Sequence, residues 1–356
     1  MLNEQISNIR QAHPGNLMAK HFDPTYFNSL SSAHQQRLLQ IIQTGIENPD
    51  SIMGAYAMHP DDYDLFQPFM DLMIRDYHNI HGELKQVSNW DFGGLFDLSR
   101  IDASLADSSM RVRVARNLNN FPLPGAMTRN ERVKFEKRMV TAFSTLIEHP
   151  AYGGRYLSLT PGSTHQISAE RYEQLITEHK IFKDMSADPY LSVAGISSDW
   201  PYGRGMYESA DGQFIVWVGE EDHLRIMAMK RGTLLNEIFN LLHDSLEVLE
   251  QQGLNFACSD TYGYVTSCPT NLGTGMRASL HLALPKLTNN GQNLEAMKPI
   301  AKKLNMSIRG AGGEHTDAGA GGIVDISPSA RLQITEAEIC QRLYAGVEAL
   351  WEQELK

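Results

Sequence analysis

Apolar residues recur at helical spacing through the first eighty positions of the chain. In the segment 31–44 they lie three and four positions apart, and a turn signal follows. The segment 61–80 repeats this pattern, and we expect Pro68 to kink this helix and Gly82 to cap its end. The pattern therefore predicts a helical N-terminal part, with a short loop over 51–56 between its two main helices.

From residue 110 onward the spacing changes to an alternation of apolar and polar residues, which indicates strands with one polar face. Strands are predicted over 110–114, 213–218, 223–226, 262–267, 277–284 and 322–326. Helices interleave with them, because Thr128 and Thr335 each open a capping box and 233–252 is amphipathic. The α+β and α/β classes both fit, since the pattern does not give the connections between strands.

An irregular stretch, 87–109, separates the two patterns and carries Gly93-Gly94 among many short polar residues. We predict that it links two domains. The length of 356 residues agrees with two domains of about 150 residues each, and 42% hydrophobic residues suffice for a large core.

Charge and cysteine usage narrow the class of protein. The net charge of −11 disfavours generic binding to nucleic acid or to an anionic membrane surface. The first fifteen residues are polar, and no stretch approaches the ~20 apolar residues of a membrane helix, so a cytoplasmic protein is expected. Three cysteines without a CxxC pair predict reduced thiols.

Arginines stand on the polar faces of several predicted strands. Arg111 and Arg113 are two residues apart, which puts them on one side of a strand, about 6.5 to 7 Å from each other. Arg225 alternates with apolar neighbours in the same way, and Arg277 shares one face of its strand with His281. Each alone fits a solvated strand face with surface ion pairs. As a set in an acidic protein they favour an oligophosphate clamp, because guanidinium groups bind phosphate oxygens bidentately.

Two glycine-rich segments accompany these arginines. Residues 268–275 read Cys-Pro-Thr-Asn-Leu-Gly-Thr-Gly, and residues 309–322 carry six glycines. Glycines let backbone amides approach a phosphate and let a loop close over a ligand. A glycine-rich turn without any ligand is the alternative, since neither segment has the spacing of a known nucleotide fingerprint.

Acids and one thiol complete the candidate chemistry. Glu220, Glu221 and Asp222 stand together at the start of a predicted strand, and Glu314 lies within the second glycine-rich segment. Cys268 opens the first segment, and flanking arginines are expected to lower the pKa of its thiol. Solvated acids and a buried, inert cysteine are the alternatives.

At three motifs the chain resembles the guanidino (phosphagen) kinases. These are Cys268 to Gly275, Glu220 to Arg225 (Glu-Glu-Asp-His-Leu-Arg) and Asp199 to Gly205 (Asp-Trp-Pro-Tyr-Gly-Arg-Gly). The likeness runs nearly end to end. It implies an α+β fold, with a small all-helical domain over 1–90 and a larger domain over 91–356 built on an antiparallel sheet flanked by helices. It also implies reversible phosphoryl transfer from MgATP to a guanidino nitrogen, with Mg²⁺ held mainly by phosphates and water.

The resemblance also implies roles for single residues. The family's nucleotide-binding positions correspond to Arg111, Arg113, His179, Arg225, Arg277, His281, Arg309 and Asp325. Those that hold the guanidinium correspond to Glu221, Cys268 and Glu314, and either carboxylate could accept the proton lost on attack. The loop 51–56 corresponds to the family's substrate-recognition loop, with Ser51, Ile52, Met53 and Tyr56 as candidate contacts.

Substrate choice remains open at the level of sequence. The length of the loop 51–56 and the presence of Glu314 favour L-arginine, whereas Ile52 and Met53 are bulkier than the residues usual in this loop. Other small guanidino compounds, such as taurocyamine or lombricine, are the alternative. The stretch 116–124 resembles bacterial protein-arginine kinases, and a silent nucleotide-binding relative is a further alternative. Nothing in the sequence distinguishes a monomer from a dimer.

Overall fold

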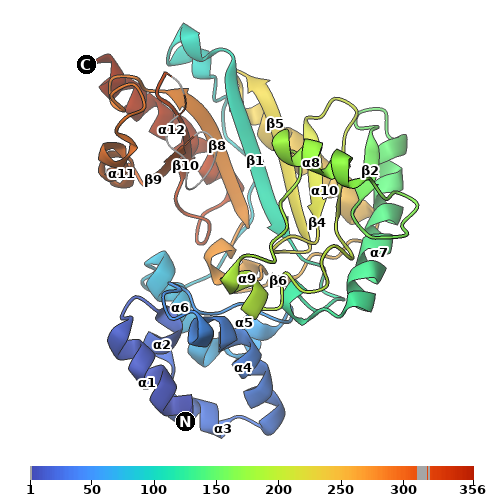
Figure 1. Cartoon of the computed structure of the whole chain (residues 1–356). Helices are drawn as coiled ribbons and strands as arrows, with labels where there is room; N and C mark the ends of the chain where they lie inside the picture. Colours follow the sequence, from blue (N-terminus) through green and yellow to red (C-terminus); the bar gives the residue numbers. More distant parts are fainter. Residues whose placement is uncertain (1, 311–318, 320) are drawn as a thin grey trace.

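The computed structural model describes residues 2–310, 319 and 321–356. The N-terminal part is helical and lies below the sheet in Figure 1. Its helices are α1 (Leu2–Ala12), α2 (Leu17–His21), α3 (Pro24–Ser29), α4 (Ser32–Glu47), α5 (Asp62–Leu65) and α6 (Gln67–His78). Asn16, Asp23 and Ser31 cap α2, α3 and α4 by accepting hydrogen bonds from backbone amides, which explains where these helices begin.

The predicted kinked helix over 61–80 is two helices. The chain breaks at Phe66, so that Pro68 stands in the first turn of α6, where its missing N–H costs no hydrogen bond. The expectation that Gly82 caps α6 is wrong. Asn79 ends the helix in the left-handed conformation, with φ of 52°, and its amide donates back to Arg75 and Asp76.

The large part is built on one eight-stranded sheet in the order β2-β3-β4-β5-β1-β8-β10-β9, in which every pair is antiparallel. The strands are β1 (Ser108–Arg116), β2 (Arg155–Ser158), β3 (Gly205–Glu208), β4 (Phe214–Val218), β5 (Leu224–Gly232), β8 (Met276–Ala283), β9 (Met306–Gly310) and β10 (Ile323–Pro328). With the separate helical domain, this establishes the α+β class. The strand predicted over 262–267 is reduced to β7 (Gly263–Tyr264), which pairs with β6 (Cys258–Ser259).

Helices cover one face of this sheet. They are α7 (Arg129–Glu148), α10 (Leu235–Gln251), α11 (Leu294–Lys303) and α12 (Glu336–Leu355). On the other face, α8 (Ala169–Thr177) packs against β4, and α9 (Pro189–Val193) lies next to α4 of the helical part (Figure 1). The predicted capping boxes at Thr128 and Thr335 are confirmed at the starts of α7 and α12. The alternating residues Met110, Val112 and Val114 of β1 enter the core beneath these helices, which leaves the polar residues of β1 for the opposite face.

The core of the helical domain extends into the large part. Tyr262, Val265, Leu272 and Leu332 are buried in the same apolar cluster as residues of α4 and α6. The two parts therefore share a core, and the segment that precedes Cys268 rests on the helical domain.

The irregular stretch between the two parts is tied down along its length. Gln86 donates its amide to Thr261 O and its side-chain nitrogen to Ile334 O, and Asn89 donates its amide to the buried carboxylate of Glu336. Within the described ranges, no helix is long and apolar enough to cross a membrane.

Candidate active site

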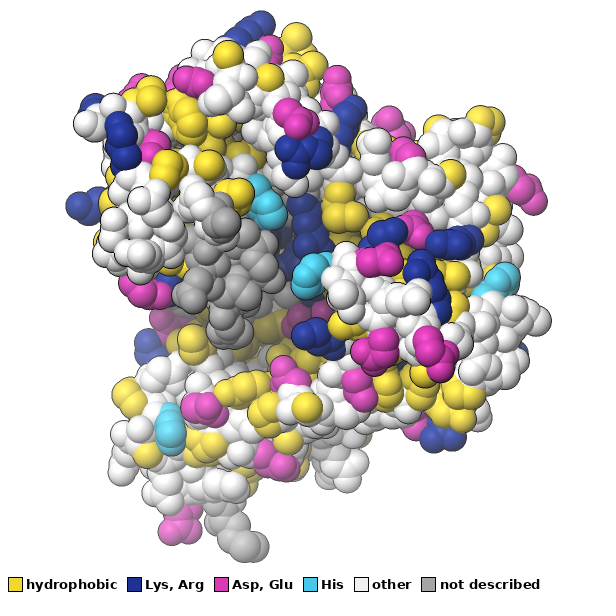
Figure 2. All heavy atoms as spheres, turned by 45° about the horizontal axis from the view of Figure 1, so that its top comes forward, with side chains coloured by type: hydrophobic (Ala, Val, Ile, Leu, Met, Phe, Trp, Pro, Cys, Tyr) yellow, Lys and Arg dark blue, Asp and Glu magenta, His cyan; other side chains and the backbone are white. Residues whose placement is uncertain are grey.

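A cavity of about 1180 Å³ lies on the sheet face opposite the covering helices. Figure 2 shows dark blue Lys and Arg side chains at the bottom of this hollow and histidines at its rim. Neighbouring strands contribute these charges because the sheet is antiparallel and its register brings the polar faces of β5, β1, β8 and β10 into line.

The sheet register brings arginines directly against one another. Arg113 of β1 stands opposite Arg277 of β8, and Arg111 stands opposite Ser279. Arg225 of β5 pairs with Ala115, two residues along from Arg113 on the same face. Like charges directly across a sheet are destabilising. This face is therefore arranged for a multiply charged anion rather than for stability alone.

The electrostatics of these arginines agree with that interpretation. Burial, together with the guanidinium groups of Arg225 and Arg277, lowers the pKa of Arg111 to about 10. The pKa of Arg113 is lowered well below its ordinary value by burial and by the same neighbouring cations. Arg225 and Arg277 each retain a carboxylate partner, Glu220 at 2.8 Å and Asp325 at 2.5 Å. Phosphate oxygens would relieve the repulsion among these guanidinium groups.

Asp325 lies on β10 between β8 and β9, at one end of the cavity. It pairs in register with His281 on one side and with Arg309 on the other. The imidazole Nε2 of His281 lies 3.9 Å from Asp325 Oδ2. His179 lines the opposite side, just beyond α8, where its backbone takes the left-handed conformation with φ of 55°.

Glu221 lies in the turn that leads into β5, where it lines the cavity. Burial and the charges of Asp222 and Glu220 raise the pKa of Glu221 to about 8, although Arg225 and Arg113 act in the opposite direction. A bound guanidinium would favour the charged form of this carboxyl.

The neighbouring Asp222 fixes this turn to the segment before Cys268. Its Oδ1 accepts from Asn117 Nδ2 at 2.7 Å and from the Ser267 amide at 2.6 Å. His223 is buried beside it, accepts from the Leu118 amide and meets Pro122 O with its other ring nitrogen. The turn is thus held by hydrogen bonds on both sides.

Cys268 lies behind the cavity wall, 8% exposed, with its Sγ 3.1 Å from Thr270 Oγ1. Burial and the nearby Glu221 carboxylate raise the pKa of the Cys268 thiol to about 12. The expectation that flanking arginines lower this pKa is wrong for this structure, because burial and the acids of the turn raise it.

The glycines of the segment 268–275 serve close packing. A Cβ on Gly273, whose φ is 96°, would lie 2.2 Å from Arg331 O, and one on Gly275 would lie 2.8 Å from Ala115 O. The Gly273 amide already donates to Tyr262 O. The prediction that these glycines bring backbone amides to a phosphate therefore fails at Gly273, whose amide is used within the protein.

The loop 51–56 stands on the helical domain and is tightly folded. Ser51 Oγ accepts from the Gly54 amide at 3.0 Å, and the carbonyls of Ile52 and Met53 accept from Leu17 and Met18. The Ile52 side chain is 65% exposed, whereas the Met53 side chain, at 5%, is part of the helical core.

Two consequences follow for this loop as a candidate binding element. Met53 offers only its backbone, because its side chain is buried. In the part of the chain that the structure describes, the amides of Ile52 and Met53 donate to no protein group. The Tyr56 hydroxyl lies close enough to Cys268 and Glu221 for their negative charges, added to burial, to raise its pKa.

Most of the residues singled out in the sequence come together. The cavity is lined by Arg111, Arg113, His179, Glu221, Arg225, Arg277, His281, Arg309 and Asp325. Cys268 and the loop 51–56 lie outside this lining, behind it and on the helical domain. Glu314 and most of the second glycine-rich segment lie outside the described residues.

Sequence reasoning missed several residues of the lining. Thr270 and Asn271 lie within the glycine-rich motif without being singled out there, and Tyr77 lies within the helix predicted over 61–80. Trp217 lines the cavity as well. Its Nε1 donates to Lys180 O at 2.6 Å and its ring lies 5.3 Å from the Arg225 guanidinium. Such contacts depend on tertiary packing, which has no signal in sequence.

The side chains of the site determine how a metal ion would be held there. Among the described residues, no three His, Cys, Asp or Glu side chains are grouped as metal ligands. Asp325 lines the cavity and is paired with Arg277, and Glu220 is paired with Arg225 of the lining. Such a site fits Mg²⁺ that arrives with a nucleotide, since Mg²⁺ keeps waters and binds substrate phosphates.

Two protein-family models match most of the chain. The model of the ATP:guanido phosphotransferase C-terminal catalytic domain matches residues 134–356, and the model of the corresponding N-terminal domain matches residues 13–75. An arginine kinase of Amphioctopus fangsiao, Oct f 2, is 36% identical over 355 residues, which cover 98% of this chain and 97% of that protein. An arginine kinase of Penaeus vannamei, Lit v 2.0101, is 36% identical over 93% of this chain and 90% of its own length.

Solved structures give a second comparison. The duplicated taurocyamine kinase from Schistosoma mansoni, with bound components of a transition state analogue, superposes with a TM-score of 0.83 at 31% identity over 99% of this chain. This chain spans about half of that duplicated protein, 48%. A lombricine kinase superposes with a TM-score of 0.82 at 27% identity over 96% of this chain and 92% of its own.

Proposed function

This chain belongs to the ATP:guanido phosphotransferase family, and on that premise we propose that it transfers the γ-phosphoryl group of MgATP reversibly to L-arginine, giving phosphoarginine and ADP. In this proposal residues 1–90 recognise the guanidino substrate and residues 91–356 bind the nucleotide. The observation that carries the proposal is the row of arginines on one sheet face, with Arg113 directly opposite Arg277.

In the proposed reaction, the arginines hold the phosphates. Arg111, Arg113, Arg225, Arg277 and Arg309 line one cavity. Cations arranged in advance around the transferring group neutralise the charge that is spread over its oxygens in the transition state. Mg²⁺ would bind the phosphates and lower their negative charge further. His179, His281 and Asp325 line the same cavity and are the proposed contacts of the nucleoside end.

In the same proposal, the guanidino group is held by Glu221, Glu314 and Cys268. A guanidino nitrogen attacks the γ-phosphorus, the bond from that phosphorus to the β–γ bridging oxygen breaks, and ADP leaves. The nitrogen loses one proton, and Glu221 is the candidate acceptor because its raised pKa makes it a better base than an ordinary carboxylate. Fixing the nitrogen in line with the phosphorus supplies much of the rate.

L-arginine is proposed first because of the loop 51–56 and the relatives. The amides of Ile52 and Met53, which donate to no described protein group, suit an α-carboxylate, and the Tyr56 hydroxyl lies near Cys268. The two relatives at 36% identity are arginine kinases. The likeness to a taurocyamine kinase and a lombricine kinase supports a second candidate, another small guanidino substrate.

The test is an ADP-release assay with MgATP and a panel of acceptors. L-arginine, taurocyamine, lombricine, creatine and an arginine-rich protein are compared by kcat/KM. The proposal expects the highest value for L-arginine. A higher value for taurocyamine or lombricine would move the assignment to the second candidate. If none of the acceptors supported ADP release, guanidino kinase activity would be contradicted.

A further inference from the structure

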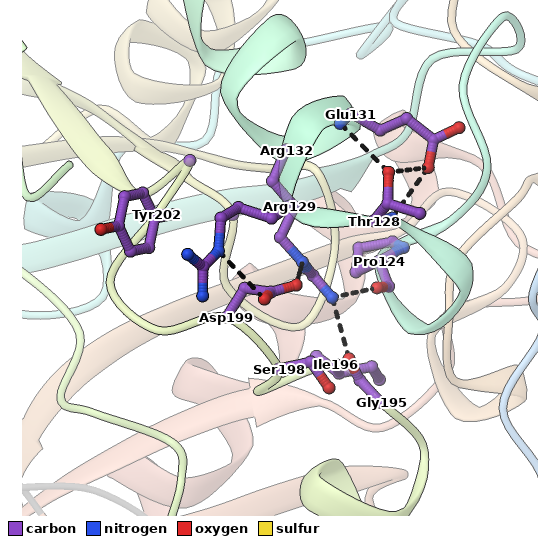
Figure 3. A network of polar contacts seen from close by, with 12 residues as sticks. Pro124, Thr128, Arg129, Glu131, Arg132, Gly195, Ile196, Ser198, Asp199 and Tyr202 are labelled. Carbon is purple, nitrogen blue, oxygen red and sulfur yellow. Dashed lines mark hydrogen bonds and ion pairs between the residues drawn. The ribbon is translucent and has the colours of Figure 1, made fainter.

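A buried arginine outside the cavity joins two segments of the large part. Arg132 stands in the first turn of α7, is 3% exposed, and does not line the cavity. Its Nη2 donates to Pro124 O at 2.7 Å and to Gly195 O at 2.8 Å (Figure 3). One guanidinium nitrogen thus bridges backbone carbonyls that are 71 residues apart in sequence by their numbers.

These two carbonyls belong to the segments on which the helical domain rests, which we call the docking segments, 122–127 and 189–195. In the first, the Leu123 amide donates to Met58 O at 2.9 Å, two residues beyond Tyr56. In the second, Tyr190 O accepts from Thr44 Oγ1 at 3.1 Å and Pro189 O accepts from Asn48 Nδ2 at 3.3 Å.

The docking segments approach each other closely at two glycines, Gly125 and Gly195. A Cβ on Gly195 would lie 2.6 Å from Gly125 O, and a Cβ on Gly125 would lie 2.5 Å from Ala194 O. Backbones at this distance hold no side chain between them. The bridge from Arg132 therefore fixes their relative position.

Arg132 donates its hydrogen bonds to these two carbonyls and makes only a long ion pair with Asp199. Its Nε makes no hydrogen bond and lies 3.8 Å from Asp199 Oδ2, while Asp199 Oδ1 accepts from the neighbouring Arg129 at 3.3 Å (Figure 3). Burial lowers the pKa of Arg132 to about 10, so the guanidinium remains charged at neutral pH. Burying a guanidinium whose hydrogen bonds go to backbone carbonyls is costly, which indicates that the positions of these carbonyls matter.

The first docking segment also leads to the catalytic turn. His223, two residues after Glu221, meets Pro122 O with its Nε2 at 2.8 Å. The segment is therefore held at one end beside Glu221 and at the other by Arg132. A shift of the segment would change the distance between the cavity and the loop 51–56.

We propose that Arg132 is a positioning residue for the guanidino substrate, which sets the placement of the helical domain and its loop 51–56 through the two docking segments. The kinetic test of this inference rests on the proposed function, because it compares KM values for the guanidino substrate and for ATP. It requires no contact between Arg132 and either substrate. The nucleotide-binding face of the sheet is built without the docking segments, so ATP binding should be affected little.

The kinetic test compares three variants with the intact enzyme, using L-arginine or whichever acceptor of the panel is used best. Arg132→Met should raise the KM for the guanidino substrate about tenfold and the KM for ATP less than about twofold. Arg132→Lys, which keeps a cationic donor, should restore part of the difference. Arg129→Met is the matched control, because Arg129 is exposed on the same helical turn and shares Asp199, and both KM values should stay within about twofold.

An equal rise in both KM values, an unchanged ratio of the two, or the same effect from Arg129→Met would overturn the proposal. If Arg132→Met does not fold, the ratio of KM values in Arg132→Lys decides in the same way. Hydrogen exchange at the Leu123 amide gives a reading that needs no activity. It should become faster in the Arg132 variant, and unchanged exchange would overturn the inference even if the proposed function had failed in the assay.

Discussion

The backbone amide of Ala57 donates to the carbonyl of Ser267 at 2.8 Å. This bond joins the end of the loop 51–56 directly to the residue before Cys268. The loop and the thiol are 211 positions apart by the numbers of Ala57 and Cys268, and they come from different parts of the fold. The loop 51–56 is therefore mechanically linked to the segment that carries Cys268.

Removing the Tyr56 hydroxyl tests that link. Tyr56→Phe should raise the KM for L-arginine about fivefold, the effect of ~1 kcal/mol for one hydrogen bond, and leave the KM for ATP unchanged. Steady-state kinetics with each substrate varied in turn measure both values. Tyr26→Phe, on α3 of the helical domain, is the control. An unchanged KM for L-arginine would show that the hydroxyl does not meet the substrate.

Replacing Arg113 should separate activity from stability. Arg113→Met should lower kcat/KM by about a hundredfold or more, because one cation of the phosphate site is lost. The ligand-free variant should nevertheless melt ~2 °C higher, since the burial and repulsion that lower the pKa of Arg113 disappear. Thermal melts with and without ADP measure this, and Arg155→Met on the exposed edge strand β2 is the control. A lower melting temperature without ligand would contradict the role of repulsion.

The thiol of Cys268 should respond to the charge of Glu221. Glu221→Gln should lower the pKa of Cys268, because the carboxylate contributes to raising it. The pH dependence of alkylation at Cys268, followed by mass spectrometry, gives this pKa. Glu237→Gln, which removes a carboxylate on α10, should leave it unchanged. If both variants behave alike, the Coulomb interaction between Glu221 and Cys268 is not the cause.

Binding of L-arginine should strengthen as pH rises through the range set by Glu221. The pKa of this carboxyl is raised to about 8 in the free protein, so below that pH it is largely neutral and attracts a guanidinium weakly. Calorimetry between about pH 6.5 and 8.5 should show Kd falling as pH rises. Glu221→Gln should bind weakly at every pH in this range, and a variant that kept the pH dependence would point to another group.

The same raised pKa has a consequence for folding. In the unfolded chain Glu221 titrates near its ordinary value, so between that value and about 8 the folded protein binds more protons. Stability contributed by this carboxyl is therefore lost as pH rises through that window. Binding and stability respond to pH in opposite directions at one residue, which is expected of a group held for its function.

How far the sequence predicts the site depends on the range of the interaction. Arg111 and Arg113 are on one face of β1 because alternation is local, and the burial pattern of the strand confirms it. That Arg113 meets Arg277 depends on pairing between distant strands, and periodicity alone could not give this register. That these arginines belong to one nucleotide site was implied by the resemblance at the motifs, and not by the local pattern.

The errors of prediction have a common physical origin in packing. Met53 and Ile52 are adjacent apolar residues, yet one is in the core and the other in solvent. The pKa of Cys268 is raised mainly by burial and by Glu221, 47 positions away by number, and the nearby Thr270 only opposes that shift. Gly273 is explained by its distance from Arg331, which no local rule contains.

The core shared between the helical domain and the segment before Cys268 limits how this chain can be divided. A large domain expressed alone would expose Tyr262, Val265 and Leu272 to water, and a helical domain alone would lose the apolar residues that close its core. The unit that can be duplicated, fused or exchanged between proteins with its chemistry intact is then the pair of domains together. Shuffling of one domain without the other would have to rebuild that surface first.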